Sequence, residues 1–142
     1  MPAIRFPSSA VPLLPLCKGH GENYIFRTYA DFINLMVAYG FHLHSEQGQK
    51  IPNKPTFVDN PNPINLEVFE NRGLYSTFVM LALAYDDSRQ VAEDEEQLTS
   101  LIERYAYLGA WHLAGATQGK TEEAIRLFLC EIMSEADPSI KI

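Results

Sequence analysis

Residues 98–113 decide the fold, and they read Leu-Thr-Ser-Leu-Ile-Glu-Arg-Tyr-Ala-Tyr-Leu-Gly-Ala-Trp-His-Leu. Their apolar side chains recur every three or four positions, which is the period of one face of an α-helix. The acidic run 93–96 precedes them, and carboxylates stabilise the positive end of a helix dipole. The pattern predicts a long helix over residues 92–113, ended by Gly115.

Three more helices are predicted, over residues 29–39, 73–85 and 122–134, because apolar residues recur there at the same spacing. The first has Thr28 as its N-cap and Gly40 as its stop. The second is almost wholly apolar, so we expect it to be central and buried on most sides. The last is expected to start after an N-cap at Thr121.

The rest of the chain is rich in proline and favours extended structure. Residues 1–23 carry Pro7, Pro12 and Pro15 and are predicted to form an extended arm. Residues 41–44, Phe-His-Leu-His, alternate apolar and polar, which favours a short strand or an extended segment. Residues 56–58 would pair with it in a small hairpin.

A chain of 142 residues normally makes one domain, which we expect to span 24–142 behind the arm 1–23. The predicted fold is mainly α: a compact, partly orthogonal four-helix bundle with an extended N-terminal arm and room for one small β-hairpin. With 46% apolar and 20% charged residues, the composition excludes collagen, a coiled-coil rod and global disorder.

Targeting and cofactor signals are missing from the sequence. No run of 18 apolar residues predicts a membrane span, and the proline-broken start does not resemble a signal peptide, so we expect a cytoplasmic protein. Cys17 and Cys130 lie far apart and match no metal-binding spacing. We therefore predict no metal and no cofactor.

The charge is unevenly distributed, and this disfavours DNA as a partner. The net charge is −7, and residues 72–142 carry twelve acidic but only six basic side chains. A basic patch is possible only in the first half, where His42, His44, Lys50 and Lys54 form a candidate contact for nucleic acid or a partner protein. The alternative interpretation is a polar loop. His42 and His44 could also bind a metal together with His20, although solvated histidines are more common.

Two further features contain residue types that occur at nucleotide or catalytic sites. Residues 115–121 resemble a phosphate-binding loop, but three residues rather than four separate the glycines and a helix precedes them, so a helix–helix turn is favoured. His112 lies on the apolar stripe of the long helix, and the sequence places no nucleophile or acid beside it. The chain is therefore predicted not to be an enzyme.

The apolar and aromatic residues of the arm and of the long helix also predict self-association. The arm offers four apolar side chains at positions 11, 13, 14 and 16, and Tyr107 and Trp111 are four residues apart on the long helix. Aromatic residues are enriched at the centres of interfaces, so a homodimer is predicted. The alternative is that the arm folds back over Tyr107 and Trp111 of the same chain.

The order of motifs resembles a known family. Residues 32–52 form a helix that meets a Gly-Phe step before a polar loop, and Ile64-Asn-Leu-Glu-Val-Phe-Glu-Asn, Leu-Ala-Leu-Ala at 81–84 and Ile-Glu-Arg-Tyr-Ala-Tyr-Leu-Gly at 102–109 follow. This is similar to the fourth Dnd system-associated protein family, which is encoded beside DNA phosphorothioation genes. The resemblance implies an accessory or adaptor role in DNA sulphur modification or its associated restriction, with other Dnd-system proteins as partners. The alternative function is a nucleic-acid-binding module that uses the loop 41–56.

Overall fold

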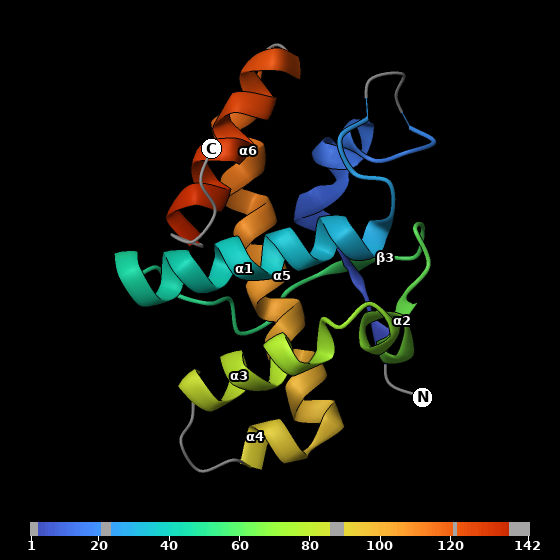
Figure 1. The fold of residues 1–142 in the computed structure, drawn as a ribbon, viewed down its shortest axis with the longest axis vertical. Coiled ribbons are helices and arrows are strands. Elements are labelled where there is room, and N and C mark those ends of the chain that lie inside the picture. Colours follow the sequence, from blue (N-terminus) through green and yellow to red (C-terminus); the bar gives the residue numbers. More distant parts are fainter. Residues whose placement is uncertain (1–2, 21–23, 86–89, 121, 137–142) are drawn as a thin grey trace.

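A computed structural model describes residues 3–20, 24–85, 90–120 and 122–136. It is mainly helical, as predicted, and two long helices form its frame: α1 (Tyr29–Gln47) crosses α5 (Glu95–Thr117) near the middle of both (Figure 1). The remaining elements are short strands and helices around this crossing: β1 (Ala3–Ile4), β2 (Phe6–Pro7), the 3-10 helix η1 (Ser8–Leu16), β3 (Phe57–Val58), β4 (Ile64–Asn65), α2 (Leu66–Asn71), α3 (Tyr75–Tyr85), α4 (Gln90–Glu93) and α6 (Glu122–Ala136).

Helix α1 begins as predicted but is two turns longer. The Thr28 hydroxyl accepts a hydrogen bond from the Asp31 amide at 3.1 Å, so the N-cap is confirmed. The predicted stop at Gly40 is wrong, because the helix continues to Gln47 and ends at Gly48, whose φ is 69°. The predicted extended segment at 41–44 is therefore wrong too.

Gly40 has a different role, which is to let α1 and α5 touch backbone to backbone. A Cβ at Gly40 would lie 1.9 Å from the Tyr105 carbonyl oxygen, and a Cβ at Gly109 would lie 2.1 Å from the Met36 carbonyl oxygen. Each helix thus lacks a side chain where the other helix's carbonyl group lies. Only glycine at both positions permits the backbones of α1 and α5 to lie this close together.

Helix α5 is the long helix predicted from residues 98–113. The Asp94 carboxylate caps it by accepting hydrogen bonds from the amides of Glu96 and Gln97, at 3.0 and 3.3 Å. The predicted end at Gly115 is wrong, since α5 continues to Thr117. Helix α6 follows over residues 122–136, and its predicted N-cap Thr121 lies outside the described residues.

The N-terminal arm is extended only in part. Strand β1 pairs with β4, and β2 pairs with β3, both antiparallel, so residues 57–58 pair with the arm rather than with residues 41–44. Residues 8–16 form a 3-10 helix, because the φ fixed by proline suits that conformation. Its three residues per turn align Ala10, Leu13 and Leu16 on one buried face.

An ion pair fastens the arm to α5. Glu103 is only 2% exposed, and its carboxylate accepts hydrogen bonds from the backbone amide, Nε and Nη2 of Arg5 at 2.7, 2.8 and 2.9 Å. The Arg5 guanidinium also lies 3.8 Å from the centre of the Phe57 ring. The hydrogen bond to Glu103 raises the pKa of Arg5. The arm is therefore part of the packed structure.

The expectation that the second helix is central is wrong. Helix α3 buries Phe78 and Ala82 and leaves Met80 and Tyr85 69% and 45% exposed. It lies at the end of the molecule where α5 begins (Figure 1). The core centres instead on α1 and α5, whose Phe32, Ile33, Ile102 and Tyr105 are fully buried. No helix of the described residues has the length and hydropathy that a membrane span needs.

The glycine crossing predicts the outcome of two substitutions. Gly40→Ala places a methyl group against the Tyr105 carbonyl, so it should lower the free energy of unfolding by about 3 kcal/mol. For the single chain, measured at high dilution, Gly115→Ala is the matched control, because a Cβ there meets nothing within 4 Å. Alanine should keep or raise stability at that position, by up to about 1 kcal/mol. Urea unfolding followed by circular dichroism measures both, and equal stabilities would contradict the proposed contact.

Candidate functional site

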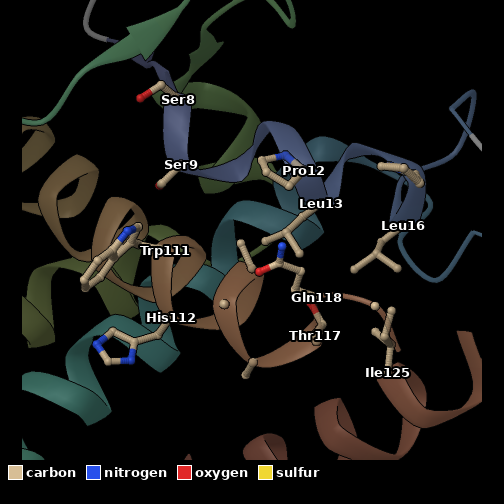
Figure 2. Close-up of a pocket in the computed structure, with 15 residues that line it drawn as sticks. Ser8, Ser9, Pro12, Leu13, Leu16, Trp111, His112, Thr117, Gln118 and Ile125 are labelled. Atoms are coloured by element: carbon tan, nitrogen blue, oxygen red, sulfur yellow. The ribbon is translucent and has the colours of Figure 1, made fainter. Parts of the chain in front are cut away.

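A groove of about 950 Å³ lies between η1 and the C-terminal turns of α5. Figure 2 shows Pro12 and Leu13 above the end of α5, with Trp111 at one end of the groove and Ile125 of α6 at the other. The threefold period of η1 builds one wall, because Ser9, Pro12 and Pro15 share a face. The groove therefore depends on the arm being fastened to α5.

The groove is apolar and carries no formal charge. None of the described residues that line it is Asp, Glu, Lys or Arg. The Thr117 hydroxyl donates to the Leu113 carbonyl at 2.7 Å, so it is satisfied within α5. The Nε2 atom of His112 is buried and has no hydrogen-bond partner among the described residues. Such a surface suits an apolar, uncharged occupant.

Trp111 is the most conspicuous side chain of this site. It is 61% exposed, and its indole ring lies edge-on to the His112 ring with the centroids 5.4 Å apart. Tyr107, one turn earlier, is half-buried, and the Ser9 hydroxyl donates to its carbonyl oxygen at 3.0 Å. The arm thus lies over α5 at Tyr107 and leaves Trp111 open. The two residues predicted for self-association differ in exposure.

The structure separates the two histidines of the predicted loop site. His42 and His44 lie on α1, where two residues differ by about 200° around the axis, so they do not share a side as an extended segment would require. The His44 ring lies near Tyr105 and Tyr85, at centroid distances of 6.0 and 6.4 Å, and its Nδ1 is 2.8 Å from the Gln49 carbonyl oxygen. His44 therefore supports the packing at this end of α1.

The two lysines of that site are exposed on a loop anchored to α5. Lys50 and Lys54 face solvent, and Arg104 of α5 donates from Nε to the Pro52 carbonyl at 2.9 Å. His20, the third residue considered for a metal, lies in the arm segment and hydrogen-bonds the Tyr29 hydroxyl. Within the described part of the chain, no three His, Cys, Asp or Glu side chains come together as metal ligands would.

The groove is not predicted from the sequence, although signals for it are present there. Residues 8–16 repeat with a period of three, as Ala10, Leu13 and Leu16 do on one face and Ser9, Pro12 and Pro15 on the next. Proline breaks an α-helix, but Pro12 and Pro15 lie within this 3-10 helix. Gly115 was interpreted as a helix end, although it lies within α5 and lines the groove.

Tyr105 is a second unusual group, buried beside the Phe41 and His44 rings. Its hydroxyl has no hydrogen-bond partner among the residues described. Burial raises the pKa of Tyr105 to about 12, with Tyr85 adding to the rise and Arg104 opposing it. Burial also raises the pKa of Cys17 to about 12. Both groups therefore stay protonated in the folded chain at pH values where they ionise in the unfolded chain.

Stability should consequently fall at alkaline pH. An unfolded tyrosine ionises near pH 10, while folded Tyr105 does so at about 12, so between these values the unfolded state binds fewer protons and is favoured. Tyr105→Phe removes that contribution and should flatten part of the decline, leaving the part due to Cys17. At neutral pH the substitution should change stability little, because the hydroxyl that is lost had no partner. Unfolding free energies measured across this pH range would refute the assignment if both chains declined equally.

The lysine loop gives a separate test of DNA binding. We expect no measurable binding to ordinary duplex DNA near physiological salt, because the chain has a net charge of −7 and the loop offers only Lys50 and Lys54. Fluorescence anisotropy with a labelled duplex measures this. Salt-sensitive binding that is lost in the double variant Lys50→Glu, Lys54→Glu would contradict the expectation and support the nucleic-acid alternative.

Comparison with known proteins gives one finding about relationship. No curated protein and no solved structure gives a match to this chain. A family model described as DNA sulphur modification system-associated protein 4 matches residues 4–141, which include the arm, both crossing helices and α6. The chain belongs to this family of DNA sulphur modification system-associated proteins.

Proposed function

We propose that this chain is a non-enzymatic accessory protein of a DNA sulphur modification system, and that it binds a basic partner protein of that system through α3. Family membership supports the association with such a system. The exposed apolar side chains of α3 support the binding role. This function does not depend on DNA contact by the chain itself.

The observation that carries the proposal is the poor burial of an apolar helix. In the eleven residues of α3, only Phe78 and Ala82 are buried. Met80 and Tyr85 are 69% and 45% exposed, and Val68 on neighbouring α2 is 41% exposed. Exposed apolar side chains on and beside one helix favour a protein interaction site there.

Acidic residues beside α3 define the chemistry of the partner. Glu70 and Glu95 lie close enough to Tyr75 at the start of α3 to raise its pKa, after the larger effect of burial. Glu93, Asp94 and Glu96 are exposed at the junction of α4 and α5. An apolar centre with an acidic rim complements a partner that has apolar residues within a basic surface, as proteins that handle DNA do. Complementary charge speeds association and orients the partner.

The test is co-purification with the proteins of the modification system, each produced together with the tagged chain. Met80→Glu places a charge in the apolar centre and should reduce retention of the partner roughly thirty-fold, the effect of losing a central contact worth about 2 kcal/mol. Leu127→Glu is the matched control, because Leu127 is 63% exposed on α6, away from α3. It should leave retention unchanged.

The acidic rim is tested in the same assay. The double variant Glu95→Lys, Glu96→Lys should weaken retention most at low salt, where charge interactions are least screened. Retention of no system protein would overturn the proposal, and so would equal retention by the wild type and Met80→Glu. Loss of binding in both Met80→Glu and Leu127→Glu, with helicity preserved, would place the binding surface elsewhere.

A further inference from the structure

The groove and Trp111 lie on the same face of the molecule, next to each other. Trp111 projects from α5 with 61% of its surface exposed, and the groove beside it is a hollow of about 950 Å³. In a two-fold dimer, one surface patch must fit its own copy, so a projection and a hollow must occur on the same patch. This face meets that requirement.

Gly115 adds a second, independent observation. It lies one helical turn after Trp111 on the same side of α5, since residues four apart share a face. A Cβ at Gly115 would meet nothing within 4 Å, in contrast to Gly40 and Gly109, which the chain itself needs as glycine. Glycine inside a helix is destabilising relative to alanine. No contact in the described chain explains glycine at 115, whereas a ring packed flat against the helix from outside would.

We infer that this face forms a two-fold homodimer in which Trp111 of each copy packs over Gly115 of the other, inside the groove. A two-fold axis that passes outside α5, on the side of Trp111 and Gly115 and level with Leu113, makes the two helices antiparallel and places positions 111 and 115 opposite each other. The wall of η1 then covers the incoming indole ring. The inference concerns a surface distinct from α3 and does not depend on the proposed partner.

Charge does not oppose a second copy as the occupant. Two chains of net charge −7 repel each other, so a stable contact needs a surface free of acidic residues. The described lining of the groove has no formal charge. The acidic start of α5 at Glu95 is sixteen residues from Trp111, about 24 Å along the helix and beyond the screening length at physiological salt. Antiparallel packing also directs the two acidic ends away from each other.

The first experiment measures mass by light scattering over a wide range of concentration. The wild-type chain should approach twice 16.0 kDa as concentration rises. Trp111→Glu should remain a monomer with an unchanged helical circular dichroism spectrum, and Gly115→Leu should weaken dimerisation at least tenfold by filling the hollow. Leu127→Glu, an equally exposed position on α6, is the control and should dimerise like the wild type.

A second experiment tests the pairing of 111 with 115 directly. In a Cys130→Ser background, which removes the exposed native thiol, Trp111→Cys and Gly115→Cys chains are mixed and oxidised. The mixture should form a disulfide-linked dimer, whereas each variant alone should not, because identical positions are not opposite each other. A mixed dimer also keeps one Trp111–Gly115 contact, which favours its formation.

Three results would overturn the inference. The first is a wild-type monomer at every concentration, which would leave the groove to a different protein. The second is a dimer that persists in both Trp111→Glu and Gly115→Leu. The third is equal disulfide formation by single variants and by the mixture, which would indicate another symmetry. Met80→Glu changes α3 and not the groove, so it should dimerise like the wild type. A loss of partner binding in that variant can then be attributed to the α3 surface and not to loss of the dimer.

Discussion

The contact on which the structure depends is the crossing of two glycines. Gly40 and Gly109 each lie against a carbonyl group of the opposite helix, at distances that leave no room for a Cβ. The contact is reciprocal: Gly40 faces Tyr105, Gly109 faces Met36, and the paired positions are one turn apart on each helix. Because the two backbones touch, the side chains of α1 and α5 on either side of the crossing pack against each other and are buried. The remaining elements pack around this centre.

A buried carboxylate links the arm to that centre, in addition to the strand pairs and the apolar face of η1. Glu103 on α5 takes three hydrogen bonds from Arg5, and leaving a buried carboxylate without its partner is strongly unfavourable. This contact fixes the register of β1 and β2 and so brings η1 to the surface of α5. The groove exists because η1 is held there. The ion pair near the middle of α5 therefore helps to place the groove at its C-terminal end.

The periodicity of apolar residues predicts the helices well, because it reflects which side chains are buried. It fails at positions where a residue is present for a reason other than burial in the core. Residues 98–113 and 29–39 form helices as predicted, since their apolar side chains face one core. Gly40 and Gly115 were interpreted as helix ends, because the sequence does not distinguish a glycine that ends a helix from one that admits a neighbour. The apolar run of α3 was interpreted as buried, yet Met80 is 69% exposed. Apolar composition does not distinguish a core helix from an interaction surface.

The candidate sites could be predicted only in part. Lys50 and Lys54 lie on an exposed loop, as expected for a polar segment. The groove depends on the contact of the arm with Glu103, which connects residues 98 positions apart and leaves no local signal in the sequence.

The groove and the α3 surface lie near opposite ends of α5 and differ in chemistry, and this has a consequence for assembly. The groove is uncharged and lies at the C-terminal end of α5. The α3 surface lies near the N-terminal end of α5 and has acidic side chains beside it. An antiparallel dimer closed at Trp111 would leave both α3 faces free and would carry them on opposite sides of its axis. A single protein partner with two basic sites, or two partners on one DNA molecule, would then be held at two points. The second contact would form within the same complex, at a high effective concentration, so modest affinity at each α3 face would suffice for stable association. A chain with one α3 surface would thus gain a second by pairing with a copy of itself.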